Sequence, residues 1–195
     1  MRRLAAMAIS CVLGIAAAGC ASPPSRLYTL SAAAGPAVAV SDLSVAVGPV
    51  SVPAAVDRPE IVVTTGPNAL RLDEFNRWAS PLSNNIARVV AENLVTLLGT
   101  PRVTLSPQTL SADADFRAVI EVQRFDSTLG EAALLDAVWT VRRTRDGKAE
   151  TGRTTVREPA PAKSHDGLVA AHSRAVGRLS QDIADAVRAL ERSGR

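Results

Sequence analysis

The sequence predicts a single α+β domain in which a mostly antiparallel or mixed sheet packs against two long amphipathic helices. Apolar and β-branched residues alternate in several short segments, which is the period of a half-buried strand. In two longer segments apolar residues recur every three or four positions, as in a helix that buries one face. The order is strands, helix, strands, helix, with hairpin signals between strands, and this order favours α+β.

The first part of the chain is predicted to hold four short strands separated by turns. Alternation predicts these strands at 26–30, 43–52, 60–65 and 69–72. Gly48-Pro49 should interrupt the second strand, because proline donates no hydrogen bond to a sheet. Pro53 should end that strand, and residues 54–58 and 66–68 should form turns.

Two long helices are predicted, one in the middle of the chain and one at its end. The first should start at Ser80-Pro81, because serine is a favoured cap and proline a favoured first helical residue. Gly99 should end it. The apolar positions of the two helices lie within 86–98 and 168–190.

The segment between the helices is predicted to form further strands. These are expected at 103–105, 115–125, 133–141 and 151–158. Asp146-Gly147 is a hairpin turn signal between the last two. The run from Arg142 to Arg145 is charged, and we expect it to be solvated and to protect a sheet edge from aggregation.

The N-terminus has the form of a bacterial lipoprotein signal. Two arginines precede an apolar run over 4–18, too short for the ~20 residues of a spanning helix, and Cys20 follows Ala-Ala-Gly. We expect Cys20 to be acylated, with palmitate among its acyl chains, and to become the mature N-terminus. The alternative is an ordinary signal peptide with Cys20 as a free thiol. The predicted organisation is a signal peptide at 1–19, a lipidated cysteine and tether at 20–34 and a periplasmic domain at 35–195.

Charge and cysteine content narrow the function classes. Without the two signal arginines, 20 basic residues face 19 acidic ones, and no dense basic run occurs, so nucleic-acid binding is not expected. The cysteines are Cys11, inside the signal, and Cys20. A mature chain with Cys20 acylated has no thiol for a disulfide, so its core must stabilise it.

Catalytic and metal-binding patterns are weak in this sequence. His165 and His172 are seven residues apart, about 10 Å along a helix, which is too far to hold one metal ion. His172 lies on an apolar stripe and is expected in the core. Asp113 and Asp115 are expected to form a turn, and no serine stands in a nucleophile motif. The sequence predicts no metal, no cofactor and no catalytic residue, and therefore a protein that is not an enzyme.

Two segments are distinctive. VGPVSVPAAVDRPEIV spans 47–62, and LDEFNRWASPL spans 72–82. Together with the lipoprotein signal, the early LYTL at 27–30 and the helix after Pro81, they resemble the ABC-type transport auxiliary lipoprotein component family. The resemblance covers about residues 26–190, and beyond Gly99 it is one of layout rather than motif.

The resemblance implies a non-enzymatic periplasmic accessory component. Members work in systems that combine an ABC transporter, an MCE-domain protein and a lipoprotein, and that move phospholipid or other hydrophobic compounds between the inner and outer membranes. The implied partners are the membrane, through acylated Cys20, and the MCE-domain and ABC transporter proteins. Some members form rings, so a homo-oligomeric ring is one assembly that the resemblance allows.

The same features bear on the cellular location of the protein and on the alternative functions. Ala21 stands where aspartate favours inner-membrane retention, which predicts an outer-membrane anchor with the domain facing the periplasm. A structural or assembly lipoprotein of the envelope would have a similar composition and is the main alternative. A periplasmic hydrolase would need a nucleophile and base in one pocket, and a direct lipid carrier would need a deep apolar cavity.

The motif residues are the candidate partner-binding residues. They are Pro49, Pro53, Asp57, Arg58, Phe75, Arg77, Trp78 and Pro81. Trp78 either contacts a partner or lipid, or packs over the sheet beside the helix. Asp57 and Arg58 either pair and hold the turn before Pro59, or bind a partner. The two prolines at 49 and 53 are expected to shape an edge or bend.

Overall fold

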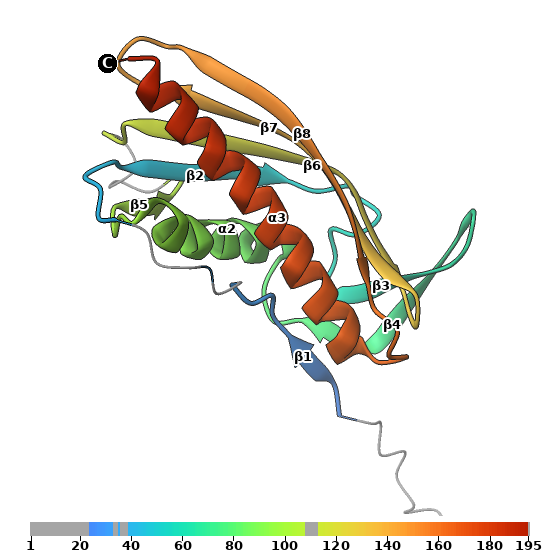
Figure 1. The fold of residues 1–195 in the computed structure, drawn as a ribbon. Coiled ribbons are helices and arrows are strands. Elements are labelled where there is room, and N and C mark those ends of the chain that lie inside the picture. The colour runs from blue at the N-terminus through green and yellow to red at the C-terminus, as the bar shows by residue number, and fades with distance from the viewer. Residues whose placement is uncertain (1–23, 33–34, 36–38, 108–112, 195) are drawn as a thin grey trace, which may run out of the picture.

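The computed structural model describes residues 24–32, 35, 39–107 and 113–194. Figure 1 shows a long sheet with two helices lying across one face, and a smaller sheet at the end where the chain begins. The predicted signal peptide and Cys20 lie outside the described residues.

The larger sheet has five strands in the order β5-β2-β6-β7-β8. Its strands are β2 (Val45–Ser51), β5 (Val103–Leu105), β6 (Phe116–Thr128), β7 (Ala132–Arg143) and β8 (Ala149–Pro159). β2 is parallel to both neighbours, whereas β6, β7 and β8 form an antiparallel meander. The sheet is therefore mixed, as the sequence predicts.

Gly48-Pro49 interrupts β2 as expected. The pairing of β2 with β6 shifts between Val47 and Val50, so the ladder is broken at Gly48 and Pro49. Gly48 has a φ of 115°, and a Cβ there would lie 3.0 Å from the backbone oxygen of Ser106. Only glycine fits this conformation and this close approach without strain.

The smaller sheet is a departure from the expected single sheet. Its strands are β1 (Arg26–Tyr28), β3 (Glu60–Gly66) and β4 (Ala69–Trp78), in the order β1-β4-β3. β4 runs well past the predicted strand at 69–72, because pairing with β1 extends it to Trp78. β1 lies inside the range 20–34, so the folded part of the chain already begins at Arg26.

The two helices are α2 (Leu82–Leu98) and α3 (His165–Arg192). The predicted start of α2 is wrong in one detail: Pro81 occupies the cap position, and no side chain caps the helix. Pro81 instead accepts a hydrogen bond from the backbone N–H of Asn85 at 3.0 Å. Gly99 ends α2 with a φ of 64°, as predicted.

One apolar core joins both sheets and both helices, which makes the fold a single α+β domain. Its members include Val45 of β2, Ile61 of β3, Ile86 of α2 and Leu179 of α3. A buried hydrogen bond from Asn93 to the Ser180 hydroxyl, at 3.0 Å, ties α2 to α3 inside this core.

The charged hairpin arm at 142–145 is solvated at Arg142, Thr144 and Arg145, as the sequence predicts, but it is not an edge and Arg143 is buried. β7 is an inner strand, because β8 covers it, and Arg143 is only 2% exposed. The Arg143 guanidinium binds Asp146 at 2.6 Å and donates to the carbonyl of Leu190 at the end of α3. Its hydrogen bond to Asp146 lowers the pKa of that carboxyl to about 2.

Candidate interaction surface

The two distinctive sequence segments meet in the smaller sheet. Pairing of β3 with β4 sets Glu60 opposite Arg77 and Val62 opposite Leu72. Arg77 and Glu60 also form an ion pair at 3.0 Å. Both side chains are partly exposed, so this pair contributes only ~0–1 kcal/mol to stability. The segments thus build one structural unit together with β1.

The turn before β3 is held by its backbone. The carbonyl of Pro53 accepts hydrogen bonds from the N–H groups of Val56 and Asp57 at 3.0 and 3.1 Å. Asp57 and Arg58 are both described and exposed, and their side chains form no ion pair with each other. Their charges therefore face solvent, and of the two roles considered for them, pairing with each other does not occur. Pro49 is also exposed.

Trp78 lies in the core, where β4 ends beside α2. It is 6% exposed, and its ring meets Phe125 of β6 edge-on with centroids 6.2 Å apart. The backbone N–H of Trp78 donates to the carbonyl of Pro59 at 2.7 Å. Of the two roles considered for Trp78, packing over the sheet is the one that the structure shows. Pro81 is exposed at the start of α2.

A buried serine and histidine lie behind Trp78. Phe125 stacks on His172 with centroids 3.8 Å apart, and Nε2 of His172 lies 2.8 Å from the Ser127 hydroxyl. Burial lowers the pKa of His172 to about 3. Because Ser127 is 2% and His172 1% exposed, a substrate cannot reach this pair. It serves packing, and the predicted core position of His172 is confirmed.

A chain of polar contacts fastens β1 to β4 and to the start of α3. The Tyr28 hydroxyl donates to the Asn76 side chain at 3.0 Å, and Asn76 donates to Asp73 at 2.8 Å. The Asp73 carboxylate lies 3.0 Å from Nε2 of His165. Burial raises the pKa of Asp73, but the Asn76 hydrogen bond and nearby positive charge outweigh it, so the pKa is below its usual value.

Exposed apolar side chains concentrate on the same small sheet. Four of them form what we call the apolar end face: Leu27, Leu70, Leu72 and Phe75, which are 67%, 56%, 44% and 40% exposed. Of these four, only Phe75 is among the candidate residues from the sequence, although Leu27 and Leu72 also stand in its distinctive stretches. The three leucines escaped sequence reasoning, because a leucine in a strand looks the same whether its face is buried or open. The alternation of Leu70 and Leu72 along β4 is the one signal that could have revealed these two.

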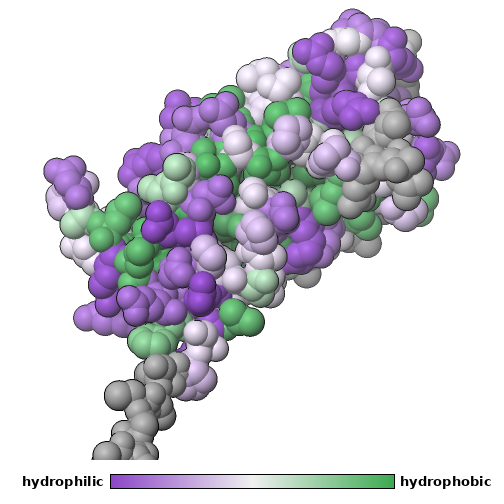
Figure 2. All heavy atoms as spheres, turned by 180° about the vertical axis from the view of Figure 1, so that it is seen from behind, coloured by the Kyte–Doolittle hydropathy of each residue, from purple (hydrophilic) through white to green (hydrophobic). Residues whose placement is uncertain are grey.

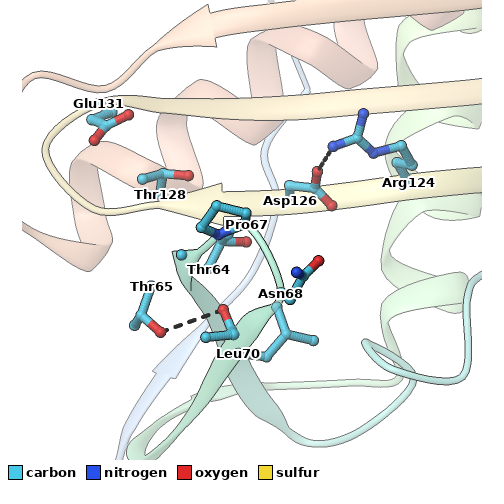
Figure 3. Close-up of a pocket in the computed structure, with 11 residues that line it drawn as sticks. Thr64, Thr65, Pro67, Asn68, Leu70, Arg124, Asp126, Thr128 and Glu131 are labelled. Atoms are coloured by element: carbon cyan, nitrogen blue, oxygen red, sulfur yellow. Dashed lines mark hydrogen bonds and ion pairs between the residues drawn. The ribbon is translucent and has the colours of Figure 1, made fainter.

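A polar cleft borders the apolar end face. It has a volume of about 610 Å³ and lies between the β3–β4 turn and the β6–β7 end of the larger sheet. Figure 3 shows Thr64 from β3 and Asn68 from the β3–β4 turn on one side of the cleft, and Asp126 and Thr128 from β6 on the other. Arg124 and Asp126 form an ion pair within β6. Hydroxyl, amide and paired charged groups suit hydrogen bonding to a partner, and the cleft holds neither a histidine nor a cysteine among its lining residues.

Two further findings concern metal binding and membrane-spanning helices. Among the residues that the structure describes, no group of three His, Cys, Asp or Glu side chains is placed to hold a metal ion. None of the helices in that part of the chain is both long and apolar enough to cross a membrane.

Comparisons with known proteins show which proteins this chain resembles. The model of a family described as "ABC-type transport auxiliary lipoprotein component" matches residues 28–184. No curated protein matches in sequence. A crystal structure from Xanthomonas campestris, of the family DUF330, superposes with a TM-score of 0.71 at 18% identity, covering 88% of this chain and 100% of that one. A second crystal structure, of an uncharacterized protein, gives 0.69 at 19% identity, covering 85% and 99%. These two likenesses concern the fold.

Proposed function

The chain belongs to the ABC-type transport auxiliary lipoprotein component family, and on this basis we propose that it is a lipid-anchored periplasmic accessory protein of a transport system. That system would combine an ABC transporter with an MCE-domain protein and move phospholipid or another hydrophobic compound between the two membranes. The observation that carries the proposal is the family match, which spans the domain from β1 to α3.

The anchor in this proposal is Cys20. A single acyl chain binds a membrane only marginally, whereas two or three hold a protein stably. Cys20 carries that number when it is acylated on its thiol and on its new amino terminus. Ala21 supports sorting to the outer membrane, and the domain then faces the periplasm.

We assign the protein a docking role rather than a catalytic one. The buried Ser127–His172 pair is out of reach of any substrate, and the cleft beside β6 offers polar groups without a nucleophile and base in contact. The exposed turn with Asp57 and Arg58 offers charges that no ion pair between them neutralises. Such charges can guide the encounter with a partner and select it.

Copurification tests this function. The tagged full chain is extracted from membranes with mild detergent, and the MCE-domain protein encoded in the same genome is sought in the eluate. Arg58→Glu should reduce its recovery, because it reverses a charge in the exposed turn. Arg178→Glu is the matched control, since Arg178 is an exposed arginine on helix α3, outside the turn.

The outcomes separate the proposal from its alternative. Recovery of the MCE-domain protein with the native chain and with Arg178→Glu, but less with Arg58→Glu, supports docking through the turn. Recovery of other envelope proteins in its place would instead support a structural or assembly lipoprotein. Cys20→Ser should release the protein into the soluble periplasmic fraction or leave it unprocessed, and unchanged membrane fractionation would contradict the lipid anchor.

A further inference from the structure

The smaller sheet lies at the end of the molecule from which the N-terminal segment leaves. Figure 1 shows β1, the β3–β4 ribbon, the β6–β7 turn and the start of α3 together at this end, with the C-terminus at the opposite end. The polar contacts of Tyr28 with Asn76, and of Asp73 with His165, hold these elements to one another. The first strand that the structure describes is therefore fastened to the rest of this end.

The apolar end face occupies one side of this sheet. Paired residues on neighbouring strands point to the same side, and so do residues two apart on one strand. Leu27 pairs with Arg77, two residues after Phe75, and Leu72 pairs with Val62 and is two residues after Leu70. Arg77 pairs with Glu60, two residues before Val62, and a register shift between Glu60 and Ile61 brings both sets to the same side although Leu72 and Phe75 are three residues apart. Ile61 and Val63, which point to the other side, belong to the core.

This side is open although it is apolar. Its four outer side chains are between 40% and 67% exposed, and Val62, which pairs with Leu72, is 6% exposed. In Figure 2 apolar side chains show among hydrophilic ones on the end of the molecule where the described chain begins. Apolar groups that gather in this way on one surface mark a contact site more often than single exposed ones do.

The length of the tether restricts what can cover this surface. Whatever its conformation, the chain from Cys20 to Arg26 spans at most about 20 Å. An acylated Cys20 lies at the level of the lipid headgroups, so β1 cannot be farther from the bilayer than that. Leu27 directly follows Arg26, and Phe75 is on the strand that pairs with β1.

We propose that the apolar end face lies on the membrane that holds the acyl chains of Cys20, so that the domain is seated on the lipid surface in one orientation. The inference rests on the proposed function, because it requires the lipid anchor. Charges of both signs accompany the face: the ion pair of Arg77 with Glu60 lies on the same side of the sheet, and Arg26 and Glu74 are exposed on β1 and β4. The contact is therefore with the apolar part of the headgroup region, and it does not depend on anionic lipid or on salt.

A labelled cysteine tests this orientation in the full lipidated chain. Phe75→Cys supplies one free thiol, because Cys11 leaves with the signal and Cys20 is acylated. The protein is reconstituted into vesicles of phosphatidylethanolamine and phosphatidylglycerol in which some lipids carry a nitroxide quencher. Val119→Cys is the matched control: Val119 is 43% exposed on β6, close to the β7–β8 turn at the far end.

Flotation with the vesicles comes first, because it reports the lipid anchor alone. In floating protein we expect a dye at position 75 to be quenched about threefold or more relative to one at 119, at low and at high salt. Equal quenching at both positions in floating protein would overturn the inference and leave the proposed function standing. Failure to float would overturn both.

A second measurement tests whether the apolar end face is instead buried against a second copy of the chain. If the dye at position 75 is shielded but not quenched by lipid, and sedimentation in detergent shows an oligomer that Leu72→Glu dissociates, the face binds a second copy and the membrane inference is wrong. A lipidated Leu72→Glu variant that floats normally but loses quenching at position 75 would support the inference. Circular dichroism melting of each variant shows that the fold is retained.

Discussion

His172 should make the stability of this domain fall as the pH falls below neutrality. The imidazole is 1% exposed and stacked on Phe125, and burial lowers its pKa to about 3. In the unfolded chain the pKa of a histidine is about 6.5. Between these values the unfolded state binds a proton that the native state does not, so the free energy of unfolding rises with pH in this window.

The size of the effect follows from the two pKa values. Above pH 7 both states are neutral and His172 adds no pH dependence. Below pH 6.5 each unit costs about 1.4 kcal/mol, so stability should drop by about 2 kcal/mol between pH 7 and pH 5. The carboxyls whose pKa is lowered, among them Asp73 and Asp146, have the same sign but a lower window. Their contribution is complete above the unfolded value near pH 4 and is lost only as the pH falls below it.

Urea unfolding at several pH values measures this dependence. The mature chain with Cys20→Ser provides a lipid-free sample, and His172→Gln removes the buried imidazole while keeping a polar group near Ser127. Any loss of stability in His172→Gln that is the same at every pH does not matter, because only the slope of the unfolding free energy with pH is compared. His165→Gln is the control, because the chain has two histidines and His165 contacts Asp73 at the start of α3.

The reasoning fails if His172→Gln keeps the full drop between pH 7 and pH 5. The same holds if His165→Gln removes that drop, because the dependence would then belong to the contact with Asp73. A drop that persists in His165→Gln and disappears in His172→Gln is the expected result.

Three further predictions concern packing and metal. Gly152→Ala should lower stability by about 1–3 kcal/mol, because a Cβ there would lie 2.2 Å from the ring of Trp139. Gly66→Ala is the control: the nearest atom to its Cβ would be 3.7 Å away, so stability should change by less than about 0.5 kcal/mol. Thermal or urea unfolding measures both. Trp78→Ala should lower the free energy of unfolding by about 3–5 kcal/mol, because it leaves a cavity in the core. Phe75→Ala should lower it by under about 1 kcal/mol, because the Phe75 side chain is already 40% exposed in the native protein. Similar losses for the two variants would contradict the placement of Trp78 in the core and Phe75 at the surface. A chelator should leave the melting temperature unchanged, and a clear decrease would reveal a structural metal ion.

Elements whose signals are local were predictable from the sequence. The stripe of α3 placed His172 in the core, and the Gly99 stop ended α2 at the residue where the structure ends it. Helical periodicity depends on residues three and four apart, and a glycine stop depends on one backbone conformation, so neither needs knowledge of distant contacts.

Arg143 shows what local signals miss. Four charged or polar residues before Asp146-Gly147 predict a solvated hairpin arm, yet Arg143 is buried. Its burial depends on the carbonyl of Leu190, 47 residues farther along the chain, which arrives only because α3 crosses the sheet to this corner. A charge pattern cannot report a partner that the fold brings from elsewhere.

By itself the sequence determined the α+β class, most strand and helix positions, and the resemblance to the family that two distinctive segments carry. Only the tertiary structure decided that those segments pair with β1 in a second sheet, that Trp78 faces the core and that Leu70 and Leu72 face outward. The physical reason is that a strand has two sides and two edges of equal local chemistry. Which side is buried, and which strand lies beside it, depends on contacts between residues far apart in the chain.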